Sequence, residues 1–447
     1  MQPSRSIGHV PIAENAAIKD RLGSFRIFAP QTSGPVDSSL LLDAQSIATP
    51  REMVRWVMSF DGSPQEVAVR EEYPSTRVGF VQIAGVLVNL EQMLSQSRQV
   101  FVDPAVIKAA VTESLYSLVL PGSNVCREGV ATVKDSWRVE VFEVFRDYRV
   151  EELSLLDVFM SLVALSDKNG ASGGVLLSRC SADESCAARD IEVPRDGRPC
   201  PTCRGSLYPT DTLRFHEEVL EEHPNLTSLG RLMVCLEHLI MVGYAQFLLQ
   251  RQPRVLGTVA FVMDGPLAIF GPQAWLHSAI LNFYHSLVRS LAAHSHRTPV
   301  LIGIEKTGQF AEHAAAISDR IPRRSIMMLP DSYIFQRILT SRPASGAIYG
   351  RDTYYGQKFF YKTAQDKLLI VTIPKPEAVV PDPHLTQHYP ELGKTLLLLD
   401  RIGTSLYENA VIPIALAHSF ASIPLRTGTR VLTLLSQQSI AREPATP

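Results

Sequence analysis

The second half of the chain alternates short apolar runs with helix-like segments, and this alternation restricts the possible folds more than any other feature. Short apolar runs predict strands, whereas apolar side chains spaced three or four residues apart predict helices. The expected strands are 256–263, 299–305, 367–374 and 430–436, and the expected helices are 227–252, 272–295, 307–319 and 401–422. Strands that alternate with helices are typical of an α/β sheet.

The first half is richer in hairpin-like segments, which predicts that the sheet is mixed. Segments 66–74 and 76–90 are rich in β-branched residues and predict the two strands of a hairpin. Apolar and polar residues alternate at 137–150, which predicts a further strand, while 150–167 has helical spacing. The expected fold class is therefore α/β, a mixed sheet flanked by helices.

Composition limits the possible classes of protein. The 447 residues, 45% of them hydrophobic and 20% charged, allow one large α/β domain with insertions or two to three smaller domains. The Pro-, Ser- and Gly-punctuated residues 1–45 are expected to form an N-terminal arm. The chain has 43 Lys and Arg residues and 45 Asp and Glu residues, which gives a net charge of −2. A protein that coats nucleic acid is normally more basic, so this charge argues against that class. Any nucleic-acid site must be local or completed by a partner.

Localisation is also predicted from composition. The first residues lack the apolar core of a secretory signal, and no stretch offers about 20 uninterrupted apolar residues. We therefore expect a cytoplasmic protein without a membrane span.

Four cysteines have the spacing C-x5-C-x13-C-x2-C within an insertion at 175–212. They are Cys180, Cys186, Cys200 and Cys203. Four thiolates fill a tetrahedral Zn²⁺ shell and leave no position for water, so the expected role is structural, in a small zinc-ribbon-like insertion. Free thiols or a redox pair are the alternatives, because the x5 gap exceeds the usual spacing. The isolated Cys126 and Cys235 are expected to be core or near-core thiols.

Two carboxylates follow apolar strand candidates, Asp61 in "MSFDGSP" and Asp264 in "MDGPLAIFG". In an α/β sheet, functional groups gather beyond the carboxyl ends of the strands. If the two strands are neighbours, the carboxylates converge, and a divalent cation such as Mg²⁺ or Mn²⁺ would relieve their repulsion. Two ordinary Asp-Gly turns are an equally good interpretation of the spacing.

Several other polar residues occupy conspicuous positions. Glu237 and His418 lie in apolar helical segments, and Glu305 closes an apolar strand, but spacing does not assign their roles. Basic residues interleaved with aromatic residues suit phosphate contact and base stacking, although an amphipathic strand or loop with solvated lysines explains them equally well. The candidate substrate contacts are Lys306, Lys358, Lys362 and Tyr355.

Six motifs, taken in order, resemble the NurA-domain nucleases. They are "DGS" (61–63), "TRVGFVQIAGVLV" (76–88), "LYPTDTLRFHEEV" (207–219), "MDGPL" (263–267), "GIEKTGQF" (303–310) and "ALAHSFASIPL" (415–425). The resemblance covers about residues 50 to 437. It implies one nuclease domain at 46–440 with a ribonuclease-H-like fold and a toroidal homodimer. It also implies a Mn²⁺- or Mg²⁺-dependent DNA nuclease that works with a hexameric HerA-type ATPase.

The resemblance also implies roles for individual residues. Asp61 and Asp264 match the family's metal-binding aspartates, Glu237 matches its helical acidic residue, and His418 matches its C-terminal histidine near the metals. Glu217 or Glu218 are alternative matches for the acidic residue. Asp-Gly-Pro replaces Asp-Gly-Ser at Asp264, and the cysteine insertion is an elaboration similar to those of bacterial-type relatives.

The expected function is therefore a metal-dependent deoxyribonuclease in DNA end processing or anti-phage defence. Two alternatives stay open at this point. One is a catalytically idle adaptor subunit of the ATPase, and the other is a nuclease that acts on RNA.

Overall fold

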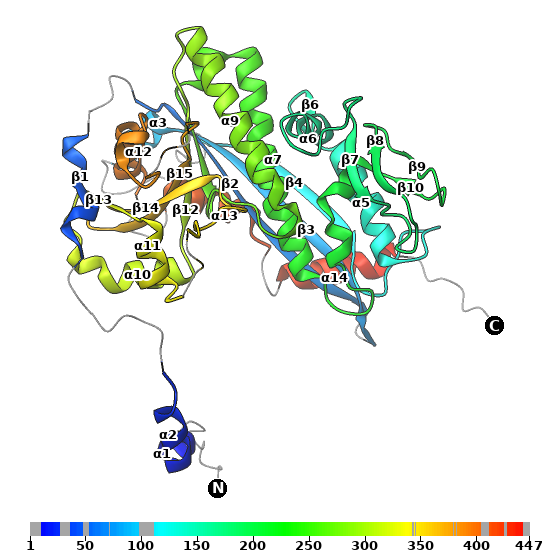
Figure 1. Ribbon diagram of the computed structural model, residues 1–447. Coiled ribbons are helices and arrows are strands. Elements are labelled where there is room, and N and C mark those ends of the chain that lie inside the picture. Colours follow the sequence, from blue (N-terminus) through cyan, green and yellow to red (C-terminus); the bar gives the residue numbers. More distant parts are fainter. Residues whose placement is uncertain are drawn as a thin grey trace.

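A nine-stranded mixed sheet organises the protein (Figure 1). The computed structural model describes residues 10–26, 36–47, 53–70, 72–97, 111–341, 344, 346–378, 380, 382–403, 411–423 and 427–440. The strand order is β1-β13-β14-β15-β12-β11-β2-β3-β4. The strands are β1 Leu41–Asp43, β2 Trp56–Arg70, β3 Tyr73–Asn89, β4 Val111–Pro121, β11 Val259–Asp264, β12 Val300–Glu305, β13 Ser325–Met328, β14 Gly356–Lys362 and β15 Leu368–Pro374.

The directions of the strands confirm that the sheet is mixed. β11 pairs in parallel with both of its neighbours, β2 and β12. The remaining pairs of the described sheet are antiparallel, including the long β2–β3 hairpin. Parallel neighbours need crossover connections, and the chain between β2 and β11 contains several helices. The predicted α/β class is therefore confirmed.

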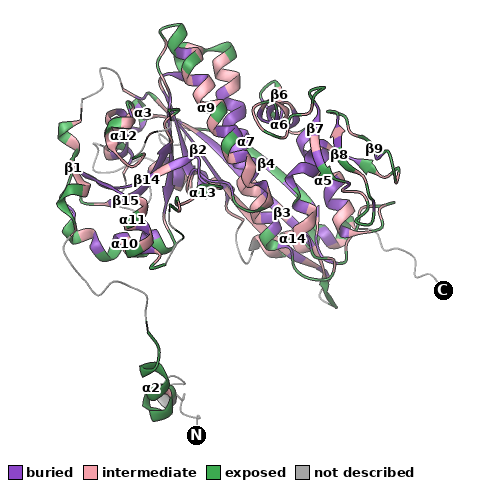
Figure 2. Ribbon diagram, in the orientation of Figure 1, coloured by how far each residue is buried: buried purple, intermediate pink, exposed green. Residues whose placement is uncertain are grey.

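Helices cover both faces of the sheet, whose central strands are largely buried (Figure 2). Alternate residues of a strand point to opposite faces, so each face has its own apolar cluster. On one face, Met58 and Phe60 of β2 share an apolar cluster with side chains of α5 (Val133–Asp147), α6 (Leu155–Val163), α7 (Leu226–Arg251) and α9 (Leu276–Ala293). On the other face, Val57 packs with α3 (Leu90–Ser97), α12 (Leu392–Ile402) and α13 (Ile412–Ala421). A third cluster joins α10 (Gln309–Ile317) to β13, β14 and β15.

Smaller elements surround this framework. The helices are α1 Val10–Glu14, α2 Ala16–Gly23, α8 Pro253–Leu256, α11 Asp331–Tyr333 and α14 Thr427–Ser439. The short strands are β5 Arg149–Val150, β6 Leu153–Ser154, β7 Val175–Arg179, β8 Arg189–Val193, β9 Arg198–Pro199 and β10 Ser206–Leu207. Within the expected N-terminal arm, α2 has no buried residue, while β1 pairs with β13 at the edge of the main sheet. Residues 1–9 and 27–35 of that arm lie outside the described residues.

The long helix α7 is a core helix of the protein. It has the length and hydropathy of a membrane span, but 67% of its most apolar window is buried inside the structure. Leu232, Leu236 and Leu239 are among its residues that pack in the first apolar cluster. Among the described residues, α7 is the one helix that meets these criteria of length and hydropathy.

The predicted strand at 137–150 is wrong, because this segment forms most of α5. Thr132 caps the helix, with its side-chain oxygen accepting a hydrogen bond from the backbone N–H of Asp135. The buried residues Val133, Trp137 and Val141 follow a helical period, as do Val144 and Phe145. The alternation of apolar and polar residues at 137–150 therefore resembles a strand only by chance. The Thr132 cap and the burial of one face of α5 stabilise a helix instead.

The predictions for the C-terminal region are also wrong in part. The expected strand 430–436 lies within α14, and the expected helix 401–422 is divided between α12 and α13. Gly403 follows the end of α12, and Pro413 stands in the first turn of α13. Glycine favours the end of a helix and proline favours its start, so the two residues mark separate helices. Residues 404–410 lie outside the described residues.

Trp137→Ala is expected to destabilise the protein by about 3–5 kcal/mol, because it removes a large buried side chain. Trp137 is fully buried, and its indole N–H donates a hydrogen bond to the carbonyl oxygen of Pro121, 2.6 Å away. Leu115→Ala on β4 is the control, because Leu115 is 50% exposed and its loss should cost about 0.5 kcal/mol or less. Equal midpoints for the two variants in urea unfolding would contradict this account of α5.

Candidate functional site

Asp61 and Asp264 lie side by side on neighbouring parallel strands. The register of β2 and β11 pairs Phe60 with Met263, so the next residue of each strand is one of these aspartates. Asp264 ends β11, as expected, whereas Asp61 lies within β2, which continues to Arg70. The expectation that Asp61 ends its strand is therefore wrong, because β2 extends beyond β11 through its hairpin with β3.

The electrostatic setting of Asp61 reflects this proximity. Asp61 is buried, and burial is the largest cause that raises the pKa of its carboxyl group, followed by the negative charge of Asp264. His418 and Lys306 act in the opposite direction and lower this pKa. Because the two carboxylates are partly shielded from water and close together, nearby positive charge is needed to stabilise their ionised forms.

Each aspartate contacts a basic side chain. Nδ1 of His418, on α13, lies 2.7 Å from Oδ2 of Asp61. Nζ of Lys306, directly after β12, donates to Oδ2 of Asp264 at 2.6 Å. The side chain of His418 is 65% exposed and that of Lys306 is 26% exposed, so both basic groups lie at the solvent side of the carboxylates.

Glu237 approaches the same region from α7. A Cβ atom at Gly62 would lie 2.7 Å from Oε1 of Glu237 and 2.5 Å from Cγ of Met233. Gly62, the residue after Asp61, therefore leaves the space in which this carboxyl group lies. Burial raises the pKa of Glu237 well above its usual range, and the negative charges of Asp61 and Asp264 raise it further. The Asp-Gly pair in the sequence contains this glycine, but sequence reasoning assigned it only to a turn.

Asp61, Asp264 and Glu237 bring three carboxyl groups to one region, but their oxygen atoms do not form a described group that lies within 4.8 Å of one another. Mg²⁺ and Mn²⁺ prefer carboxylate oxygens and complete their shells with water or substrate phosphate. Burial, and after it the negative charge of the neighbouring carboxylates, raises the pKa of Asp61 and of Glu237, and a bound cation would lower both. In this conformation the carboxylates of Asp61 and Asp264 are engaged by His418 and Lys306.

Three of the expected substrate contacts are corrected by the structure. Lys358 and Lys362 are buried on β14, an interior strand of the sheet, and Tyr355, directly before that strand, is buried as well. The ammonium group of Lys362 donates to the carbonyl and hydroxyl oxygens of Ser318. None of the three side chains is available to DNA in this structure.

Glu305 and Lys358 form a buried ion pair beside the site. Nζ of Lys358 lies 2.7 Å from Oε1 and 2.8 Å from Oε2 of Glu305. The same ammonium group lies 3.5 Å from the ring centre of Phe310 and 4.8 Å from that of Tyr354, which are cation–π distances. Glu305, whose role the sequence left open, is therefore paired with Lys358 in this structure.

The alternative acidic residues, Glu217 and Glu218, are engaged elsewhere. Glu217 pairs with Arg179 and Arg214. Burial is the largest single effect on its pKa and raises it, but the contacts with the two arginines together outweigh burial and lower the pKa to about 2. Glu218 pairs with Arg231.

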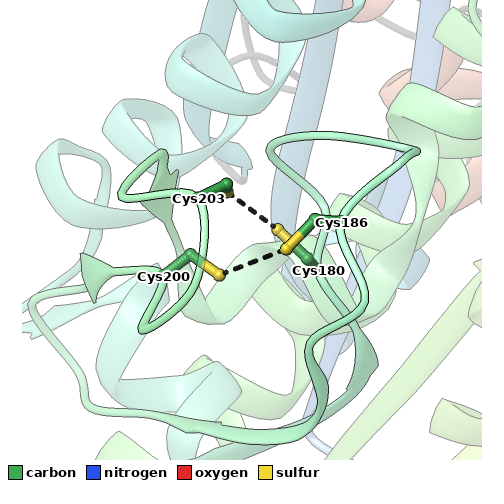
Figure 3. A group of neighbouring side chains, drawn as sticks. All are labelled: Cys180, Cys186, Cys200 and Cys203. Atoms are coloured by element: carbon green, nitrogen blue, oxygen red, sulfur yellow. Dashed lines mark hydrogen bonds between the residues drawn. The ribbon is translucent and has the colours of Figure 1, made fainter.

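The four cysteines of the insertion converge at a second position (Figure 3). Their sulfur atoms all lie within 4.8 Å of one another, with 3.6 Å between Cys180 and Cys203 and 3.8 Å between Cys186 and Cys200. Cys180 and Cys186 come from the β7–β8 connection, and the other two come from the β9–β10 connection. Among the described residues, this is the one group of three or more His, Cys, Asp or Glu side chains placed to hold a metal ion. Four thiol donors with this spacing suit a tetrahedral metal such as zinc.

The two remaining cysteines differ from each other. Cys235 is buried on α7, as expected for a core thiol. Cys126 is exposed, so its expected core position is wrong. It lies in the connection between β4 and α5, outside the regular elements that form the core.

Comparisons with known proteins give little beyond the structure itself. No protein-family model and no curated protein sequence matches the chain. A solved structure described as "Crystal structure of NurA" is similar at 10% sequence identity over 93% of this chain and 94% of the other, with a TM-score of 0.31. At this identity and TM-score, the similarity supports no statement about activity or partners.

Glu237→Gln is expected to stabilise the protein at pH 7 when divalent metals are removed with a chelator. The pKa of Glu237 in the folded protein is raised above the ordinary value of 4.5, so the folded state keeps a proton that the unfolded state loses. This carboxyl group therefore costs stability as the pH rises above its unfolded pKa, and glutamine removes a cost of up to about 3 kcal/mol at pH 7.

Thermal unfolding in chelator at pH 5 and pH 7 measures this effect, and the gain should be larger at pH 7. Glu184→Gln is the control, because its side chain is 87% exposed and its melting temperature should stay unchanged. A loss of stability in Glu237→Gln at pH 7 would contradict the buried, charge-strained setting of this residue.

Proposed function

We propose that this chain is a divalent-metal-dependent nuclease that hydrolyses phosphodiester bonds in DNA. The observation that carries the proposal is the side-by-side placement of Asp61 and Asp264 on parallel strands, with Glu237 beside Gly62. Carboxylates held together in a partly buried setting are typical of sites that bind Mg²⁺ or Mn²⁺ and use them in phosphoryl chemistry. The ordered motifs that resemble the NurA-domain nucleases support the same reaction class and a ribonuclease-H-like fold.

Asp61, Asp264 and Glu237 would hold the metal. When bound, Mn²⁺ or Mg²⁺ supplies Lewis acidity, which polarises the scissile phosphate and lowers the pKa of an attacking water. The three carboxylates would balance the positive charge of the ion and hold it at the end of β11. In this setting they are anionic ligands rather than proton carriers.

His418 is proposed to move the proton. Its imidazole is largely exposed and already contacts Asp61, which can orient the ring toward the reacting groups. An imidazole can both accept and donate a proton, so His418 can orient the attacking water or protonate the leaving oxygen.

Partners and location are proposed on the resemblance and the composition. A hexameric HerA-type ATPase would deliver DNA to a homodimer of this chain in the cytoplasm. The net charge of −2 agrees with delivery by a partner, because the chain lacks the excess of basic residues that non-specific DNA binding needs. The biological task is DNA end processing or defence against foreign DNA.

We further propose that the four clustered cysteines bind structural Zn²⁺. The insertion consists of short two-stranded pairs, and small units of this kind often depend on a metal for stability. All four donors are thiols, so the completed shell leaves no open position for catalysis.

Asp264→Asn is expected to lower Mn²⁺-dependent cleavage of linear DNA by at least about a hundredfold, because it removes a charged ligand from the metal site. Gel-based cleavage assays, with and without the ATPase, measure the effect, and circular dichroism checks the fold. Asp196→Asn is the matched control, since this side chain is 89% exposed and should leave the rate unchanged.

Other outcomes of the same assay separate the alternatives. If wild-type protein leaves DNA intact under every condition, the adaptor role replaces the nuclease. Cleavage of RNA but not of DNA would instead identify a ribonuclease. Equal cleavage by wild type and Asp264→Asn would exclude this site.

Cys200→Ser is expected to remove the bound zinc, about one ion per chain in the wild type. Cys200 is fully buried in the cluster, and a serine hydroxyl is a poor zinc ligand at neutral pH. Elemental analysis of purified protein measures the ion, with Cys126→Ser as the control at an exposed thiol. Full zinc content in Cys200→Ser would overturn the assignment.

A further inference from the structure

Lys306 lies at the end of the strand next to the one that carries Asp264. It directly follows β12, whose parallel register with β11 pairs Asp264 with Ile304. Its ammonium group contacts Asp264 at 2.6 Å, and both side chains are partly shielded from water, at 26% and 18% exposed. A lysine ammonium and a divalent cation compete for the same carboxylate oxygen, because each neutralises the same negative charge.

The residue before Lys306 holds the backbone at this position in place. Glu305, the preceding residue, ends β12 and is bound to Lys358 in the interior. The side chain of Lys306 itself is long and flexible, and its ammonium group contacts Asp264. Rotation about the bonds of this side chain can therefore carry the charged end to another partner while the backbone stays at the end of β12.

We propose that Lys306 is a counter-ion that competes with the catalytic metal for Asp264. When the metal binds, the ammonium group of Lys306 leaves Asp264 and pairs with the substrate phosphate. This inference rests on the proposed nuclease function. The ammonium group stabilises the paired aspartates until the metal displaces it. It then lies beside the site, where a phosphate oxygen with developing negative charge is its nearest new partner.

The role predicts opposite effects of one substitution on metal binding and on catalysis. Lys306→Met keeps the length of the side chain and removes its charge, so Mn²⁺ should bind about three- to tenfold more tightly. DNA cleavage at saturating Mn²⁺ should fall at least about tenfold, because the phosphate loses a charged partner. Lys306→Arg keeps the positive charge and should bind Mn²⁺ about as weakly as the wild type.

The experiment titrates full-length protein with Mn²⁺ and follows free Mn²⁺ by electron paramagnetic resonance, alongside cleavage of a labelled DNA duplex. Lys134→Met is the matched control. Lys134, on α5, is also a partly exposed lysine, and it pairs with the carboxylate of Glu184. Its Mn²⁺ affinity and cleavage rate should equal those of the wild type.

The results distinguish this inference from the proposed function. If the wild type binds Mn²⁺ through Asp264 and Lys306→Met binds it no more tightly, the counter-ion role is overturned and the nuclease proposal stands. If the wild type shows no Mn²⁺ binding that depends on Asp264, both proposals fall. If Lys306→Met binds Mn²⁺ more tightly but cleaves DNA at the wild-type rate, the proposed pairing of Lys306 with the phosphate is overturned.

Discussion

The repulsion between the carboxylates of Asp61 and Asp264 is the constraint around which the site is built. The parallel register of β2 and β11 places the two residues side by side, and burial makes the charge of Asp61 costly. Positive charge must therefore come close to both. His418 supplies it from α13, and Lys306 supplies it from the end of β12. The same requirement is the physical reason for proposing that a divalent cation binds here.

The layered fold brings these groups together from different directions. α7 and α13 pack on opposite faces of the sheet, in separate apolar clusters. Glu237 comes from α7 and His418 from α13, so the site needs both helix layers as well as the strands. Gly62 is important because any larger side chain there would collide with Glu237 and Met233. The buried pair of Glu305 and Lys358 fixes the end of β12 next to Lys306.

Sequence periodicity predicted the fold class better than it predicted single elements. The strands at 300–305 and 368–374 are fully or almost fully buried, and their uninterrupted apolar runs identify them clearly. The segments 137–150 and 430–436 were misassigned, because a short run of apolar and polar residues fits a strand or one face of a helix. The lysines of β14 were misassigned for a related reason. A lysine usually lies at the surface, but Lys358 is neutralised inside by Glu305, a partner far away in the sequence.

The sequence by itself determined the chemical groups that are present. Two aspartates follow apolar strand residues, an isolated glutamate lies in an apolar helix, and four cysteines have a spacing that two tight connections can bring together. Only the tertiary structure decided which of these groups meet. The strand register places Asp61 beside Asp264, the packing of α7 places Glu237 at Gly62, and Lys306 rather than Lys358 faces the aspartates. The reason is that pairing between strands and packing between layers join residues far apart in the chain, and local spacing carries no information about that register.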